Sequence, residues 1–255
     1  MPNNNNTTNL IISSYFCKKF VNPEKQIYIP KNDFNVIKNL YTKTRTQWDE
    51  ADIRIFHDGL DSEFIKRYTK KWIKFIYINS LAIPFSPKDV RIIVALDFIK
   101  ENPQWDNIFI VDSITVKCIC NPFNAVDNNI NSLFIATEKK KLLDNSMFLK
   151  KLNKIGEKID ESDLVGRTTF NCDIIGGHRN TLIPFLEQVQ ELIERLQELY
   201  KKNCKGGYSI RSNMIALNYV ALFYDNILTG HPLHTQNKNY QMHGNAQGNL
   251  MFTFN

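Results

Sequence analysis

The stretch DFIKENPQWDNIFIVDSITVKCICNPF, residues 97–123, decides the fold of this chain. Asn102-Pro103 ends a helix that begins at Ser86-Pro87, because a residue before proline disfavours the helical conformation and Ser-Pro is typical of a capped helix start. The next run, NIFIVD (107–112), is a nearly all-apolar strand, which is typical of a central parallel strand covered on both faces. A helix followed by such a strand indicates an α/β fold.

The same alternation of strands and helices continues on both sides of this stretch. Before it, the patterns predict strands at 10–16, 51–57 and 72–78 and helices at 32–41 and 62–68. After it, they predict strands at 115–120, 133–138 and 168–177 and helices at 144–157, 180–202 and 209–227. We therefore predict one α/β domain over 10–240, with a mostly parallel central sheet and helices on both faces. Residues 1–9 are expected to be a disordered tail and 241–255 a C-terminal tail.

Composition excludes several classes of protein. The 255 residues are 43% hydrophobic and 12% aromatic, which is too apolar for a disordered chain. A net charge of +6 favours anionic ligands but is too diffuse to indicate a nucleic-acid-binding protein. No run approaches the ~20 apolar residues that a membrane-spanning helix needs, so we expect no transmembrane segment.

The cysteines and the missing loop motifs narrow the function further. There are 5 cysteines and no C-x-x-C pair, which argues against a zinc site or a disulfide scaffold and predicts a reducing, cytoplasmic location. The sequence has no G-x-G-x-x-G, Walker or G-x-S-x-G pattern. Dinucleotide oxidoreductases, P-loop enzymes and serine hydrolases are therefore disfavoured.

Polar residues close three of the predicted strands: His57-Asp58-Gly59, Asp112-Ser113, and Asn171-Cys172-Asp173. Ligands of open α/β sheets bind at the carboxyl ends of the strands. A buried aspartate there is costly unless it is paired, hydrogen-bonded or bound to a cation. The residues alone leave two interpretations of Asp112 open. It caps its own turn through backbone N–H groups, or it faces a ligand.

Several short motifs, taken in order, resemble those of nucleotide-sugar glycosyltransferases of the GT-A fold. In that family a helix ending in Glu-Asn-Pro precedes a strand closed by aspartate and then Asn-Pro-Phe, as in residues 101–123 here. Further similar motifs, in the same order, are FHDGL (56–60), KDVR (88–91), LFIATE (133–138), NCDIIGGHR (171–179), SNMIALNYV (212–220) and GHPLHT (230–235). The resemblance implies a Rossmann-like GT-A domain that transfers a sugar from a UDP- or GDP-sugar to a hydroxyl group of a glycan or protein acceptor.

The resemblance also implies roles for individual residues. The residues expected to bind the donor are Asp58, Gly59, Arg91, Asp112, Ser113, Gly176 and Gly177. Asp112 and His234 would hold Mn²⁺ or Mg²⁺, which neutralises the charge of the departing diphosphate. Asn171 and a Gly176-Gly177 turn fall where the donor sugar meets the acceptor. Asp173 stands where the family has glycine; we predict that it is the general base, the alternative being a surface residue or a turn cap.

Two departures from the family pattern weaken the expectation of a metal. Relatives commonly carry a second acidic residue in the metal motif, whereas Asp112-Ser113-Ile114-Thr115 has none. Where relatives often have Asp-Met, this chain has Asn213-Met214. We expect weak metal binding, a metal held mainly by the diphosphate, or no metal, with Lys88 or Lys117 offsetting the phosphate charge instead. The alternative function is that of a catalytically degenerate relative that binds a nucleotide, glycan or protein without turnover.

Overall fold

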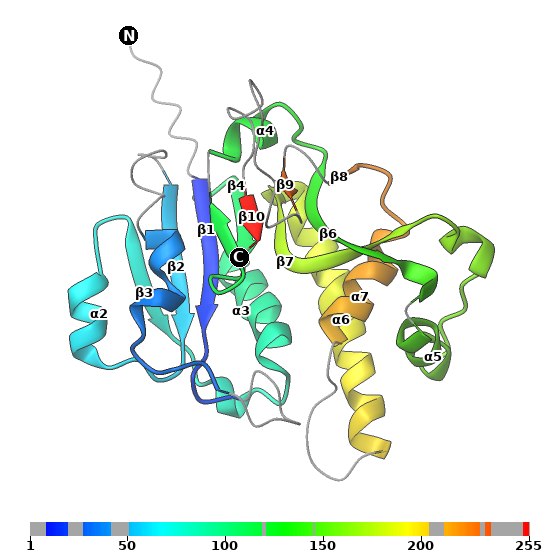
Figure 1. Cartoon of the computed structure of the whole chain (residues 1–255), viewed down its shortest axis with the longest axis horizontal. Coiled ribbons are helices and arrows are strands. Elements are labelled where there is room, and N and C mark those ends of the chain that lie inside the picture. Colours follow the sequence, from blue (N-terminus) through cyan, green and yellow to red (C-terminus); the bar gives the residue numbers. More distant parts are fainter. Residues whose placement is uncertain are drawn as a thin grey trace.

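The computed structural model describes residues 9–19, 28–41, 51–118, 121–144, 146–203, 212–229, 233–235 and 252–254. A seven-stranded sheet in the order β3-β2-β1-β4-β7-β6-β8 forms its centre (Figure 1). The strands are β1 (Asn9–Tyr15), β2 (Ala51–His57), β3 (Ile73–Tyr77), β4 (Asn107–Val111), β6 (Leu133–Lys141), β7 (Thr168–His178) and β8 (Ile227–Leu228). β7 is antiparallel to β4 and β6, and the other neighbouring pairs are parallel. The predicted α/β fold with a mostly parallel sheet is confirmed.

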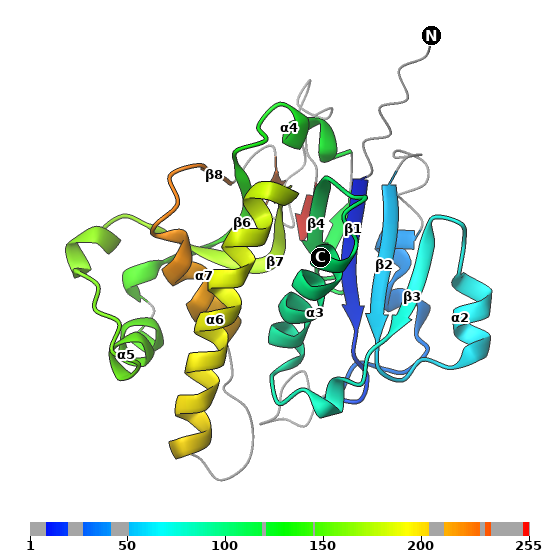
Figure 2. The same cartoon turned by 180° about the vertical axis from the view of Figure 1, so that it is seen from behind.

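Helices cover both faces of this sheet, as predicted. α3 (Pro87–Glu101), α6 (Arg179–Asn203) and α7 (Ser212–Ala221) pack on one face, which is turned toward the viewer in Figure 2. α5 (Ser146–Lys154) adds Phe148 and Leu152 to the same core. The core of the other face includes residues of the 3-10 turn η1 (Phe34–Val36), α2 (Ser62–Tyr68) and α4 (Phe123–Asp127). All five residues of β4 are buried, because this strand is covered on both sides.

α3 begins where the Ser-Pro signal predicts, with Ser86 as its cap, and the structure adds a capping box with Asp89. The Ser86 hydroxyl accepts a hydrogen bond from the Asp89 N–H, and the Asp89 carboxylate accepts one from the Ser86 N–H. The predicted helix at 32–41 is different: it starts as the 3-10 turn η1, which Asp33 caps through the Asn35 N–H. Within the described part of the chain, no helix combines the length and the apolar character needed to cross a membrane.

A second, three-stranded sheet joins the C-terminal residues to the middle of the chain. Its order is β5 (Val116–Cys118), β10 (Phe252–Phe254) and β9 (His234–Thr235). Phe252 is fully buried, and its ring centroid lies 5.3 Å from that of Phe109 in β4. The prediction of a C-terminal tail over 241–255 is therefore wrong for residues 252–254, because burial of Phe252 ties them to the domain. Residues 1–8 and 241–251 lie outside the described residues.

The predicted turn at Gly176 and Gly177 is also wrong, because both residues lie inside β7. They pair with Phe109 and Ile108 of β4. A Cβ atom on Gly176 would come within 2.2 Å of the Phe109 ring. The Phe109 ring, which packs over the strand, therefore explains the glycine at position 176. A glycine that makes room for a ring and a glycine in a turn look alike in the sequence.

Candidate functional site

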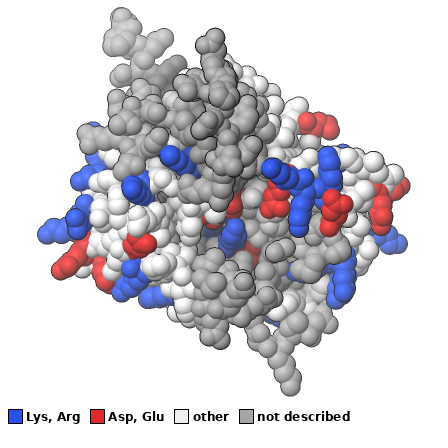
Figure 3. All heavy atoms as spheres, in the orientation of Figure 1, with Lys and Arg blue, Asp and Glu red and all other residues white. Residues whose placement is uncertain are grey.

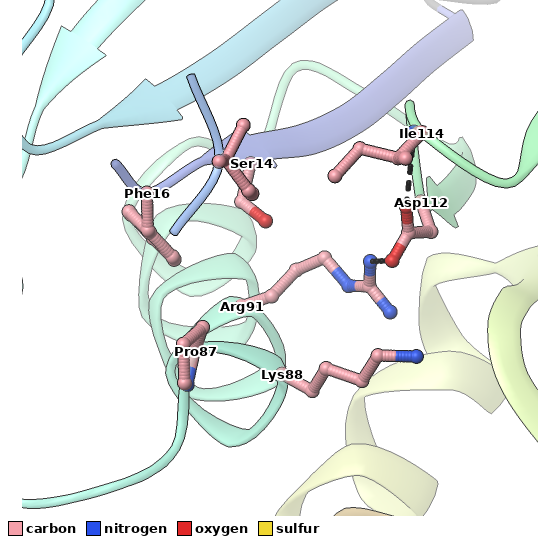
Figure 4. A pocket seen from close by; sticks show the side chains of 8 residues that line it. Ser14, Phe16, Pro87, Lys88, Arg91, Asp112 and Ile114 are labelled. Carbon is pink, nitrogen blue, oxygen red and sulfur yellow. Dashed lines mark hydrogen bonds and ion pairs between the residues drawn. The ribbon is translucent and has the colours of Figure 1, made fainter. Parts of the chain in front are cut away.

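The candidate site lies at the carboxyl ends of β1 and β4. β2 and β3 lie on one side of β1 and β4 lies on its other side, so the strand order reverses between β1 and β4. Open α/β sheets bind their ligands at this kind of switch point. Ser14 and Phe16 at the end of β1 and Asp112 after β4 line a pocket there (Figure 4).

This pocket is small and has two kinds of lining. Its volume is about 30 Å³, room for roughly one or two water molecules. The polar lining residues in the described part of the chain are Ser14, Lys88, Arg91 and Asp112, and the apolar ones are Phe16, Ile29, Pro87 and Ile114. Ile114 is 40% exposed and the Lys88 side chain 43% exposed. A cation and an apolar side chain therefore reach solvent together at the pocket.

α3 supplies the two cations of the site. Lys88 and Arg91 are three residues apart, and their side chains extend from α3 toward Asp112 (Figure 4). Arg91 is 2% exposed, and its Nη1 lies 2.8 Å from Asp112 Oδ2. Its Nη2 donates a hydrogen bond of 2.9 Å to the Cys172 carbonyl and lies 3.8 Å from Asp173 Oδ1. One buried guanidinium thus connects the two carboxylates.

Asp112 both caps its own turn and lies beside the pocket, so each of the two interpretations of this residue describes part of its surroundings. Its Oδ1 caps its own turn by accepting hydrogen bonds from the N–H groups of Ile114 at 3.0 Å and Thr115 at 3.3 Å. Its Oδ2 pairs with Arg91 beside the pocket. Burial alone would raise the pKa of Asp112, but Arg91 and Lys88 hold that pKa below its usual value. Asp112 is therefore a buried, ionised carboxylate.

Asp173 lies in a bulge of β7. The ladder with β6 passes from the pair Ile135–Ile175 directly to Ala136–Asn171, so residues 172–174 have no counterpart on β6. Such bulges redirect a side chain out of the regular ladder. Asn171 stabilises the bulge, because its Oδ1 accepts a hydrogen bond of 2.8 Å from the Asp173 N–H.

The Asp173 carboxylate contacts each side of the site. Its Oδ1 lies 3.1 Å from Lys88 Nζ, and its Oδ2 accepts a hydrogen bond of 3.0 Å from the Thr115 hydroxyl. Of the predicted site residues, the structure therefore brings together Arg91, Asp112, Asn171 and Asp173. Lys88, predicted only as a substitute for a metal, joins them, and Thr115 is a member that the sequence analysis missed.

Asp58 and Gly59, predicted to bind the donor, contact the chain that follows β1. Asp58 accepts hydrogen bonds from the Cys17 N–H at 2.7 Å, the Lys18 N–H at 3.2 Å and the Ser80 hydroxyl at 2.6 Å. A Cβ atom on Gly59 would lie 2.9 Å from Lys18 Cε. Neither residue lines the pocket, so their contribution to the site is to position the segment that carries Phe16.

Of the remaining predicted donor residues, those that the structure describes do not join the cluster, and the predicted metal ligand His234 is described only in its backbone. Ser113 is buried, and its hydroxyl has no partner among the described residues. Gly176 and Gly177 are packed in β7. His234 lies in β9, and the sheet that includes β9 also includes β5, four residues after Asp112. The His234 side chain lies outside the described residues.

A divalent cation does not fit the described donor set. Among the residues that the structure describes, no group of three His, Cys, Asp or Glu side chains converges as a metal site. Both carboxylates of the site already have cationic partners, Asp112 in Arg91 and Asp173 in Lys88. A Mn²⁺ or Mg²⁺ ion would add two positive charges beside these cations without a free carboxylate to hold it. The predicted metal role of Asp112 is therefore not supported.

Asp89, which is not among the predicted site residues, anchors α3 to α7. Asp89 is fully buried and accepts a hydrogen bond of 2.8 Å from the Asn213 N–H at the start of α7. Burial raises the pKa of its carboxyl group to about 6. The Ser86-Pro87 signal predicts the start of the helix, but no local signal predicts a partner of Asp89 that is 124 residues away.

The surface and the comparisons add little to this geometry. On the face seen in Figure 3, the described basic and acidic side chains are interspersed and form no single-sign patch. The sequence matches no model of a known protein family, and it shows no significant match to a curated protein. The function must therefore be inferred from the site, which offers one exposed lysine, one buried arginine and two carboxylates at a switch point.

Proposed function

We propose that this protein is a GT-A-like glycosyltransferase that moves a sugar from a nucleotide-sugar donor to a hydroxyl acceptor without a resident metal ion. The observation that supports this most is the meeting of Lys88, Arg91, Asp112 and Asp173 at the β1–β4 switch point. These residues come from α3, the end of β4 and β7. All four lie in the motifs that resemble the GT-A family.

Charge neutralisation by Lys88 is the first part of the proposed mechanism. When a nucleoside diphosphate leaves the sugar, negative charge develops on its phosphate oxygens and must be offset. Lys88 is the exposed cation of the pocket. Because the pocket holds only one or two waters, the diphosphate would lie across its mouth, over Lys88 and Ile114. Arg91 is buried, and its guanidinium pairs with the Asp112 and Asp173 carboxylates rather than with the phosphates.

Proton removal by Asp173 is the second part. The Asp173 carboxylate accepts the proton of the acceptor hydroxyl as that oxygen forms a bond to the anomeric carbon of the sugar. The bond from this carbon to the diphosphate breaks at the same time, and its electron pair stays on the diphosphate oxygen. Such a single displacement inverts the configuration at the anomeric carbon.

Calorimetric titration with UDP, GDP and their sugars, with and without Mn²⁺, tests this proposal. We expect binding of one nucleotide with little dependence on Mn²⁺, and slow hydrolysis of its sugar conjugate. Asp173→Asn should keep donor binding and lose turnover by about two to four orders of magnitude. Binding without turnover in the wild type would favour the degenerate alternative. The absence of heat and of thermal stabilisation with every nucleotide would contradict both functions.

A further inference from the structure

We infer that Lys88 is shared between Asp173 and the donor phosphates, so that donor binding releases the Asp173 carboxylate to act as the base. This inference rests on the proposed function and adds that the donor must bind before Asp173 can accept a proton. Without a donor, the ammonium group of Lys88 lies 3.1 Å from Asp173 Oδ1 and occupies that oxygen. With a donor, the phosphates take the ammonium group and leave the oxygen free.

The two members of this ion pair differ in their freedom to move. The Lys88 side chain is 43% exposed, whereas that of Asp173 is 8% exposed. Asp173 is also fixed on its other side, because Thr115 donates a hydrogen bond to Oδ2 at 3.0 Å. Lys88 has a flexible four-carbon stem and already lines the pocket. Lys88 is therefore the partner that turns toward a ligand.

Arg91 keeps the site from collapsing when Lys88 leaves. Its guanidinium is held by Asp112 at 2.8 Å and by the Cys172 carbonyl at 2.9 Å. It lies 3.8 Å from Asp173 Oδ1, which is longer than a hydrogen bond. Among the residues that the structure describes, Asp173 Oδ1 then has no close donor, which leaves it able to accept a proton from an acceptor hydroxyl.

The ionic exchange is favourable because a diphosphate carries more negative charge than one carboxylate. Lys88 therefore gains attraction when it turns from Asp173 to the phosphates. The exchange also orders the reaction. The base is covered until the leaving group is in place, and the same movement that frees the base neutralises the leaving group.

A double-mutant cycle on nucleoside diphosphate binding tests this coupling without any need for turnover. The variants are Lys88→Met, Asp173→Asn and the double variant, titrated by calorimetry with UDP and GDP. Lys88→Met should weaken binding about tenfold or more. Asp173→Asn should tighten binding about three- to tenfold, because Lys88 no longer has a competing partner. In the Lys88→Met background this gain should shrink to about twofold, the part due to the removed charge alone.

Lys100→Met is the matched control, since Lys100 also belongs to α3 but pairs with Glu187 at 2.6 Å. It should bind the nucleotide as the wild type does. Lys88→Arg should retain most of the affinity, and Asp173→Ser replaces Asp173→Asn if the latter does not fold. An equal gain from Asp173→Asn in both backgrounds would overturn the inference and leave the proposed function standing. No binding of UDP or GDP to folded wild-type protein would contradict the proposed function itself, and the inference with it.

Discussion

Asp58 and Asp112 occupy equivalent places in the sheet but have different surroundings. Each directly follows a largely buried strand, and each is itself buried. Asp58 accepts hydrogen bonds from the loop after β1 and from Ser80, so it joins two connections. Asp112 accepts hydrogen bonds from its own turn and pairs with Arg91 beside a pocket. A strand-end aspartate thus becomes part of a charged site where a neighbouring helix supplies a buried cation.

Of the substitutions considered, removal of the Arg91 guanidinium should lower the free energy of unfolding most. Arg91→Met leaves Asp112 and Asp173 buried without their shared guanidinium, so we expect a loss of about 3–5 kcal/mol in the free energy of unfolding at neutral pH. Urea unfolding followed by circular dichroism measures it. The loss should be smaller at low pH, where the Asp112 carboxylate is protonated. A variant whose free energy of unfolding lies within about 1 kcal/mol of the wild type would contradict the role given to Arg91. The Arg91–Asp112 pair would then contribute no more than a surface ion pair.

Asp58→Ala should cost somewhat less and should leave the ligand site intact. It removes the acceptor of buried N–H and O–H groups, and we expect a loss of about 3 kcal/mol in the free energy of unfolding. Nucleoside diphosphate affinity, measured by calorimetry well below the unfolding temperature, should change less than about threefold, or below ~0.7 kcal/mol. A larger loss of affinity would restore the direct donor contact that the sequence predicts for Asp58.

A third buried carboxylate, that of Asp89, should contribute to the free energy of unfolding with a pH dependence opposite to that of Asp112. Its pKa is raised from 3.8 to about 6 by burial, so its contribution to stability is full below pH 3.8 and is lost as the pH rises through about 6. Relative to Asp89→Asn, the wild type should therefore lose about 2–3 kcal/mol between about pH 4 and pH 7. Asp112 has the opposite sign: its pKa is lowered, so its contribution is lost only as the pH falls below its usual range. A pH-independent difference between wild type and Asp89→Asn in urea unfolding would refute the assignment.

Gly176→Ala should have the smallest effect of these changes. The added Cβ meets the Phe109 ring, and we expect a loss of about 2 kcal/mol that Phe109→Leu partly restores. Thermal unfolding of the two single variants and the double variant measures the rescue. Nucleotide affinity should stay within about twofold of the wild type. A loss of affinity without a loss of stability would support the donor-binding role predicted from the sequence.

Local signals in the sequence predict most of the elements correctly. The alternating run at 51–57 and the apolar run at 107–111 are strands, and Ser86-Pro87 starts a helix, because each depends on neighbouring residues alone. The sequence predicts a turn at Gly176 and Gly177, because glycine is common both in turns and where another group packs closely against the backbone. Only the position of the Phe109 ring distinguishes the two, and that position depends on the pairing of distant strands.

The candidate site was predictable in its residue types but not in its pairing. Arg91 and Asp112 stand out as polar residues near a helix start and at a strand end. The expectation that Asp173 also closes a strand is wrong, because β7 continues to His178. Their contacts cross long stretches of chain: Lys88 and Asp173 are 85 residues apart. The bulge that turns Asp173 toward Lys88 comes from a register shift between β6 and β7, for which the strand pattern gives no signal.

A crystal structure with a bound nucleoside diphosphate would show which group Lys88 contacts when the donor is present. We expect phosphate oxygens within hydrogen-bond distance of Lys88 Nζ at the β1–β4 switch point, with Lys88 turned away from Asp173 and Arg91 still paired with Asp112. A nucleotide bound elsewhere, with Lys88 still on Asp173, would contradict this expectation.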